Sequence, residues 1–326
     1  MSTARPLETL RAADAARFGG KSAGLGELIA SGVPVPPGFA LSADAYREAG
    51  IEGVAQVDHE DVQALRSASQ AAMDAVRGAP LPSAVRAEIE RAYAELGDSP
   101  AVAVRSSALG EDGAEATFAG QQETFLWVRG AEAVAHAVRD CWASLFTPEA
   151  ISYRARLGSP GAAMGVTVQR MVDAAVSGVM FTCNPVTGDP STVAVNASWG
   201  LGLAVVGGEV TPDEYRVSKV TREVLHRAIA SKHVEYVAGS VRVDVPEPRR
   251  NAACLDDKQL EALVALGRRI ERHFGCHQDV EWAIARDGGE LFALQSRPVT
   301  AAPARWQAPA GASAIELVMG TFGAKR

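Results

Sequence analysis

The chain has 326 residues, of which 47% are hydrophobic and 22% charged, and it carries a formal net charge of −7 at pH 7. This length suffices for one large hydrophobic core or two moderate ones. The acidic balance argues against nucleic acid or a membrane surface as a partner, and no apolar run approaches the length of a membrane-spanning helix.

The N-terminal stretch has no continuous apolar segment, so we expect no signal peptide. The cysteines are scattered and form no C-x-x-C pair, a pattern typical of packing residues in a reducing compartment. We therefore expect a cytoplasmic protein.

The first half of the chain alternates predicted helices with predicted strands. Apolar residues at helical spacing indicate the helices, and short β-branched runs indicate the strands. The predicted helices span 21–31, 60–77, 82–96, 131–145 and 148–156. The predicted strands are a short one after the proline-rich residues 33–37, then 101–107 and 123–128.

The second half of the chain changes to short β-type runs separated by Gly, Pro and Asp turns. One long helix at 256–274 precedes a final pair of strands. We predict a mixed α/β N-terminal lobe over 1–165, a β-rich C-terminal lobe over 166–300 and a tail over 301–326. A cleft between two lobes is the expected ligand site.

Residues 18–28, FGGKSAGLGEL, place Lys21 after two glycines and at the start of a predicted helix. A Walker A loop needs a glycine where Ala15 stands and a hydrophobic strand before it, and 10–18 predicts no strand. The P-loop interpretation is therefore excluded. Two others remain: Lys21 binds an anion beside the N-terminus of a helix, or it is a solvated lysine at a glycine turn.

Arg105 follows a buried apolar strand, where a guanidinium needs a partner. That partner is either a carboxylate or a phosphate held by two parallel hydrogen bonds. The adjoining loop contains Gly110, Gly113 and Gly120, and its backbone can approach a phosphate closely.

The final strand pair carries a pattern of charged and amide side chains. Asp279 and Glu281 are two residues apart, so they share one face of a strand, and Gln295 and Arg297 do the same. Carboxylates beside an amide and an arginine suit Mg²⁺ with a triphosphate, because Mg²⁺ takes few protein oxygens and completes its shell with phosphate and water. The alternative is a ladder of surface salt bridges.

These segments resemble, in order, the ATP-binding domain shared by phosphoenolpyruvate synthase, pyruvate phosphate dikinase and rifampin phosphotransferase. The resemblance covers about residues 15–300. The segments that carry it are GGKSAGLGEL, VPVPPGF, AVRSSALGEDGAEATFAGQQETFL, VTVQRMV, SGVMFTCNPVTGD, NASWGLGLAVVGGEVTPDEY and QDVEWAI with LQSRPVT.

The resemblance implies an α+β, ATP-grasp-like fold in which two lobes bind Mg-ATP. By this resemblance Lys21 and Arg105 contact phosphates, Gly120 and Thr124 belong to a phosphate-covering loop, and Gln169 lies by the adenine. Glu281 and Gln295 bind Mg²⁺ by the same resemblance. Arg297 contacts the transferring phosphates, and Asp279 is a second acid. Lys21, Arg105 and Arg297 are then the catalytic set, which offsets phosphate charge.

The resemblance also implies phosphoryl transfer. In this family a histidine on a separate swivelling domain attacks the β-phosphate of ATP, giving AMP, and passes the phosphoryl group on. Here the chain ends near where such a domain would begin, and none of its histidines lies in a carrier loop of that type. The expected partner is therefore a histidine-carrier protein on a separate chain or a small-molecule acceptor reached directly. A non-catalytic ATP-binding regulatory or scaffold module is the alternative, against which the complete set of ligand residues argues.

Overall fold

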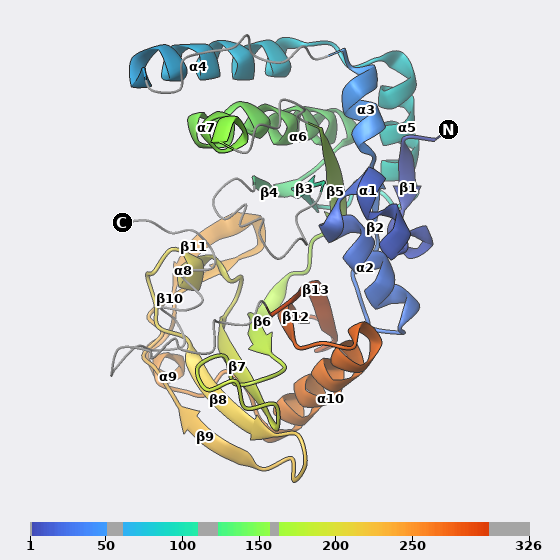
Figure 1. Cartoon of the computed structure of the whole chain (residues 1–326). Coiled ribbons are helices and arrows are strands. Elements are labelled where there is room, and N and C mark those ends of the chain that lie inside the picture. The colour runs from blue at the N-terminus through green and yellow to red at the C-terminus, as the bar shows by residue number, and fades with distance from the viewer. Residues whose placement is uncertain (1, 51–60, 110–122, 157–162, 300–326) are drawn as a thin grey trace. The chain divides into compact units, whose positions relative to one another are not determined.

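The computed structural model describes residues 2–50, 61–109, 123–156 and 163–299. The chain divides into two compact units (Figure 1). The first comprises Met1–Glu27 and Pro37–Met171, and the second comprises Leu28–Pro36 and Val172–Arg326. Each unit contains its own antiparallel sheet with helices, so the predicted α+β class is confirmed.

The first unit is built on a five-stranded sheet in the order β1-β2-β5-β3-β4. All neighbouring strands are antiparallel, and the last of them in sequence, β5, lies in the centre between β2 and β3. The strands are β1 (Ala4–Pro6), β2 (Gly38–Leu41), β3 (Val102–Ala108), β4 (Thr124–Val128) and β5 (Met164–Arg170).

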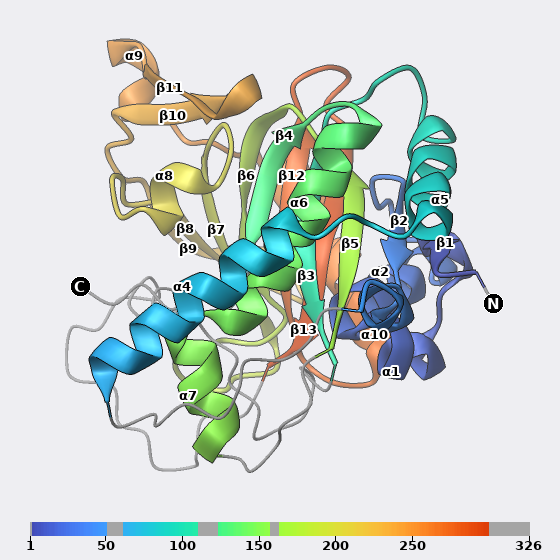
Figure 2. The ribbon, with the colours of Figure 1, turned by 90° about the horizontal axis from the view of Figure 1, so that it is seen from above.

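Helices cover one face of this sheet, and α4 lies across α6 (Figure 2). They are α3 (Ala43–Glu48), α4 (Val62–Gly78), α5 (Ser83–Ala94), α6 (Ala131–Ala143) and α7 (Pro148–Arg156). The core between helices and sheet includes Ile89 of α5, Trp142 of α6 and Val104 of β3, all fully buried. The burial of such side chains is the main favourable contribution to folding.

Two further helices, α1 (Ala15–Phe18) and α2 (Gly20–Ala30), meet at Gly19. Gly19 has φ +82°, a conformation that favours glycine, and a Cβ at this position would lie 2.2 Å from Ser107 Oγ. Helical turns rather than a strand precede Lys21, which agrees with the exclusion of a P-loop.

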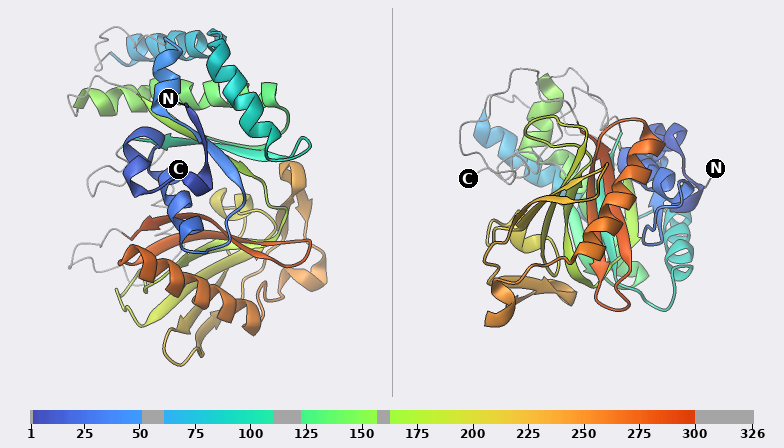
Figure 3. Two further views of the ribbon diagram at one scale, coloured as in Figure 1. Left: turned by 90° about the vertical axis from the view of Figure 1, so that its right-hand side faces the viewer. Right: turned by 90° about the horizontal axis from the view of Figure 1, so that it is seen from below.

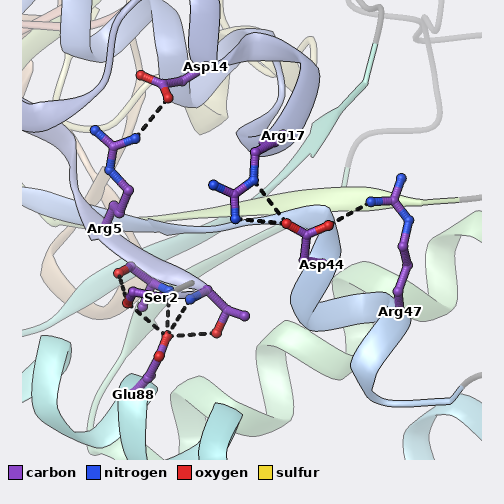
Figure 4. Close-up of polar contacts among 9 residues, drawn as sticks. Ser2, Arg5, Asp14, Arg17, Asp44, Arg47 and Glu88 are labelled. Atoms are coloured by element: carbon purple, nitrogen blue, oxygen red, sulfur yellow. Dashed lines mark hydrogen bonds and ion pairs between the residues drawn. The ribbon is translucent and has the colours of Figure 1, made fainter.

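Polar contacts hold the N-terminal strand against α5 (Figure 4). One carboxylate oxygen of Glu88 accepts hydrogen bonds from Ser2 Oγ, Thr3 N, Thr3 Oγ1 and Ala4 N, at 2.7 to 3.1 Å. These donors replace the water that the carboxylate loses. The short strand β1 is therefore fixed by one side chain as well as by its pairing with β2.

The second unit is built on a six-stranded antiparallel sheet in the order β13-β12-β6-β7-β8-β9. One side of it packs against α10 (Figure 3): a Cβ on Gly267 of this helix would lie 3.4 Å from Met180 Sδ. The elements are β6 (Ala174–Phe181), β7 (Thr192–Trp199), α8 (Leu203–Val206), β8 (Asp213–Ser218), β9 (Val224–Ala228), α10 (Asp257–Phe274), β12 (Gln278–Ala285) and β13 (Leu291–Pro298).

A two-stranded hairpin of β10 (Val234–Val237) and β11 (Val241–Asp244) and the short helix α9 (Glu247–Arg250) complete the second unit. A fully buried ion pair lies between Lys232 and Asp213. Asp213 also accepts hydrogen bonds from the backbone N of Ala230 and of Cys254, so this pair joins three separate stretches of chain.

The first unit reaches Met171, whereas the predicted lobe boundary was at residue 165. The reason is that β5 pairs with β2 and β3 and so belongs to the first sheet as a whole. Leu28–Pro36 belongs to the second unit, where Arg269 donates to the backbone O of Gly32. Within the described part of the chain, no helix has the length and apolar character needed to cross a membrane.

Candidate functional site

Lys21 is the second residue of α2, and only 8% of it is exposed. Its Nζ donates to the backbone O of Ser106 at 3.0 Å. The first turn of the helix is attached to the sheet, since Ser22 Oγ lies 2.7 Å from Thr167 Oγ1 and Ser22 N donates to Ser107 Oγ. This burial excludes the alternative of a solvated lysine and places the ammonium group next to the end of β3.

Arg105 lies in a row of side chains across the first sheet. It is opposite Thr124 of β4 on one side and Thr167 of β5 on the other. Opposed residues of antiparallel strands share a face. The alternating residues Val104 and Val168 belong to the core under the helices, so the row faces away from that core. Arg105 and Thr124, both predicted site residues, are therefore direct neighbours.

Gln169 lies on the same face as Arg105, one pair further along β5, where it is opposite Ala103. Its side chain is 3% exposed, and Nε2 has no hydrogen-bond partner among the described residues. A buried amide without a partner costs about 1–3 kcal/mol. This donor is therefore suited to an acceptor atom of a ligand. Gly120, the remaining predicted site residue of this half, lies outside the described residues.

In the second unit the four predicted residues form two cross-strand pairs. Asp279 of β12 is opposite Arg297 of β13, and Glu281 is opposite Gln295. The two pairs are two residues apart and therefore share a face. Val280 between them is opposite Met180, which packs against α10, so the four polar side chains face away from that helix.

Asp279 and Arg297 form an ion pair with an N–O distance of 2.8 Å, in which the Asp279 side chain is 6% exposed. Burial raises the pKa of Asp279, and the neighbouring Arg297 partly offsets this by lowering it. Asp279 Oδ1 is buried and has no hydrogen-bond partner in the described structure. The pair is thus not a surface ladder, and one carboxylate oxygen is left for a ligand.

This donor set fits a magnesium nucleotide. Glu281 and Gln295, which carry a carboxylate and an amide oxygen, are directly opposite each other on β12 and β13, and Asp279, with its unpartnered oxygen, lies on the same face. Mg²⁺ needs only one or two such protein oxygens when phosphates supply others. No cluster of three His, Cys, Asp or Glu side chains suited to a metal occurs within the described ranges, so a site made by such a cluster is not found there.

The hydroxyl groups that attach α2 to the sheet were not among the predicted site residues. They are Ser22, Ser107 and Thr167. The two serines that follow Arg105 were the signal available in the sequence. Which groups the Ser107 and Thr167 hydroxyls contact, however, depends on the pairing of β3 with β5.

The family model for the AMP/ATP-binding domain of pyruvate phosphate dikinase matches residues 15–314. The chain belongs to this family. A rifampicin phosphotransferase from Streptomyces sp is 44% identical over 90% of this chain and 35% of its own length. The probable phosphoenolpyruvate synthase of Methanothermobacter thermautotrophicus is 41% identical over 90% of this chain and 45% of its own length. That of Pyrococcus abyssi is 38% identical over 90% of this chain and 43% of its own length. The pyruvate phosphate dikinase-type domain described here thus spans less than half the length of these curated relatives.

Solved structures with a remote likeness include PH1788 from Pyrococcus horikoshii, at a TM-score of 0.37 and 13% identity over 85% of this chain and 88% of that chain.

Proposed function

We propose that this chain binds Mg-ATP in an ATP-grasp-like manner and supplies the ATP-binding half of a dikinase-type phosphotransfer reaction. The observation that carries the proposal is the paired arrangement on β12 and β13. Asp279 with Arg297 and Glu281 with Gln295 combine metal-binding oxygens, a cation for phosphate and a buried carboxylate oxygen without a partner. Membership of an AMP/ATP-binding family supports it.

The proposed roles follow from charge and position. Lys21, Arg105 and Arg297 offset negative charge on the phosphates. The buried position of Lys21 strengthens its attraction to a phosphate, because little water screens it. Thr124, beside Arg105, and Gly120 of the phosphate-covering loop contact phosphate oxygens, and the Gln169 amide donates to the adenine.

Glu281 and Gln295 would hold the Mg²⁺ ion through their side-chain oxygens, with Asp279 as the second acid. When bound, the ion neutralises charge on the phosphate oxygens. Arg297 keeps Asp279 oriented through its Nε, which donates to Asp279 Oδ2 at 2.9 Å. This bond is made to Oδ2 and leaves Oδ1 without a hydrogen-bond partner among the described residues. Arg297 thus has two proposed roles: it orients the Asp279 carboxylate and it contacts the phosphates.

The acceptor is proposed to be either a histidine on a separate carrier or a small molecule. Relatives named phosphoenolpyruvate synthase and rifampicin phosphotransferase match this chain with similar identity, 38% and 44%. We take this to mean that one ATP-binding half serves reactions with different acceptors.

The nucleotide product tests the proposal. The full chain is incubated with Mg-ATP, with and without candidate acceptors, and the products are separated. AMP formed only with a histidine-carrier protein supports the carrier mechanism, and turnover with a small molecule supports direct transfer. Tight ATP binding without turnover over a broad acceptor panel would instead support a regulatory module, and absence of Mg-ATP binding would refute the proposal.

Variants locate the site in the same assay. Lys21→Ala, Arg105→Ala, Glu281→Ala and Arg297→Ala are each expected to abolish ATP consumption while the far-UV spectrum stays native. The matched controls remove an exposed charge from a helix surface in each unit, Arg66→Ala on α4 and Lys258→Ala on α10, and should leave ATP consumption unchanged.

A further inference from the structure

We propose that an apolar strip beside the carboxylates of Asp279 and Glu281 keeps water away from the phosphoryl group of bound ATP. Hydrolysis of ATP in the absence of an acceptor is thereby suppressed. The strip consists of Val179, Phe181, Ala194 and Val299. The inference rests on the proposed function, and it assigns Phe181 as a residue that decides between transfer and hydrolysis.

The strip is a hydrophobic cluster of its own. Phe181 and Ala194 are each 8% exposed, and the partly buried Val179 and Val299 pack against them. The cluster is distinct from the core under the helices of the first unit and from the one around α8.

The register places the strip on the same face as the carboxylates. Phe181 of β6 is directly opposite Asp279, and Val179 is directly opposite Glu281. Ala194 of β7 is opposite Phe181 on its other side. Directly opposed residues have Cβ atoms about 4.5–5.5 Å apart. Each carboxylate therefore has an apolar side chain as its nearest cross-strand neighbour on β6.

This apolar position is not required by the core of the second unit. Met180, between Val179 and Phe181, faces α10 and packs against this helix. On the face of the strip itself polar residues continue beyond it, since Val179 is opposite Asn196 and Ala194 is opposite Arg216. The strip therefore lies between polar residues of β12 on one side and of β7 and β8 on the other. Burial in the core does not explain apolar side chains at these positions.

Water exclusion supplies that reason. In transfer, an oxygen or nitrogen of the acceptor forms the new bond to phosphorus while the bond to the leaving phosphate oxygen breaks. In hydrolysis a water oxygen forms that bond instead, and its proton passes to solvent. Removing water from the reacting phosphate suppresses the second reaction and strengthens the charge interactions of the first. Asp279 Oδ1, which is buried without a hydrogen-bond partner among the described residues, belongs to a residue whose cross-strand neighbour on β6 is the apolar Phe181.

The test measures acceptor-independent hydrolysis of Mg-ATP by the full chain together with nucleotide affinity. Phe181→Ala is expected to raise phosphate release about tenfold, with affinity for Mg-ATP little changed. Phe181→Leu, which stays apolar and large, should remain close to the wild type. Met180→Ala is the matched control, because it removes a buried side chain of the same strand from the face that packs on α10.

A second readout does not depend on turnover. With Mn²⁺ in place of Mg²⁺, water-proton relaxation reports access of water to the bound ion, and Phe181→Ala should increase that access whereas Met180→Ala should not. Unchanged hydrolysis and relaxation in Phe181→Ala, or equal increases in both alanine variants, would overturn the inference while leaving the proposed function intact. A wild-type chain that fails to bind Mg-ATP would refute the proposed function itself, and the inference with it.

Discussion

Replacing Gly19 by alanine is expected to destabilise the first unit and to weaken nucleotide binding. Gly19 has φ 82° and ψ 160°, a region used almost only by glycine, which costs another residue about 1–3 kcal/mol. A Cβ would also lie 2.2 Å from Ser107 Oγ and 2.3 Å from the Ser107 backbone oxygen, so the start of α2 or the end of β3 must move. Relieving such overlap costs about 1–3 kcal/mol more, for a total of about 2–6 kcal/mol.

Two other glycines separate these contributions. Gly50 has φ +62° and no atom within 4 Å of its Cβ position, so Gly50→Ala tests backbone conformation alone. Gly78, at the end of α4, has open space and no positive φ, and its alanine variant should be neutral or more stable. Urea unfolding of all three variants gives the free energies, and titration with Mg-ATP gives the affinities.

The expected order of destabilisation is Gly19→Ala, then Gly50→Ala, then Gly78→Ala. Only Gly19→Ala should also reduce Mg-ATP affinity, because Lys21 lies two residues further along the chain. If Gly19→Ala were no less stable than Gly50→Ala, the close approach of α2 to β3 would not be what restricts position 19 to glycine.

Three further predictions concern single side chains. Glu88→Gln should lower the free energy of unfolding by about 1–3 kcal/mol at neutral pH. Burial acts to raise the pKa of Glu88, but hydrogen bonds from Thr3, Ala4 and Ser2 lower it by more, so the folded-state pKa lies below its ordinary value. The loss of stability in the variant should therefore shrink as pH falls through the folded pKa, and a pH-independent loss would contradict this assignment. Lys232→Met should cost about 3–5 kcal/mol in urea unfolding because it leaves Asp213 buried and unpaired, and a loss under 1 kcal/mol would contradict the burial of the pair. Glu281→Gln should weaken the Mg²⁺ dependence of ATP binding more than ATP binding without metal; an equal effect on both would remove Glu281 from the metal site.

The long periodic elements were predictable from sequence. The helix predicted at 256–274 is observed as α10 at Asp257–Phe274, begun by a capping box at Asp256 and ended by left-handed Gly275. Both signals are local, so no knowledge of the fold was needed. The shared face of Asp279 and Glu281 also followed from the two-residue period of a strand, and the bulge between Glu281 and Trp282 lies beyond both pairs and does not disturb them.

Features set by non-local pairing were not predictable. Strand β1 and the hairpin of β10 and β11 have three or four residues per strand, too few for a periodic signal. The burial of Lys21 and the unpartnered amide of Gln169 depend on which strands meet beside them. For the same reason the place of β5 in the first sheet could not be read from its own residues, which fit either lobe.

The position of β5 determines when the first unit can fold during synthesis on the ribosome. Strands β1 and β2 pair with each other, and so do β3 and β4, and among the described strands β5 joins the two pairs into one sheet. A chain released before Met164 lacks the middle of its first sheet, with two strand edges exposed where β5 belongs. The first unit is therefore expected to fold only after residue 170 has left the exit tunnel, and pulse proteolysis of stalled chains on either side of that length would show the change.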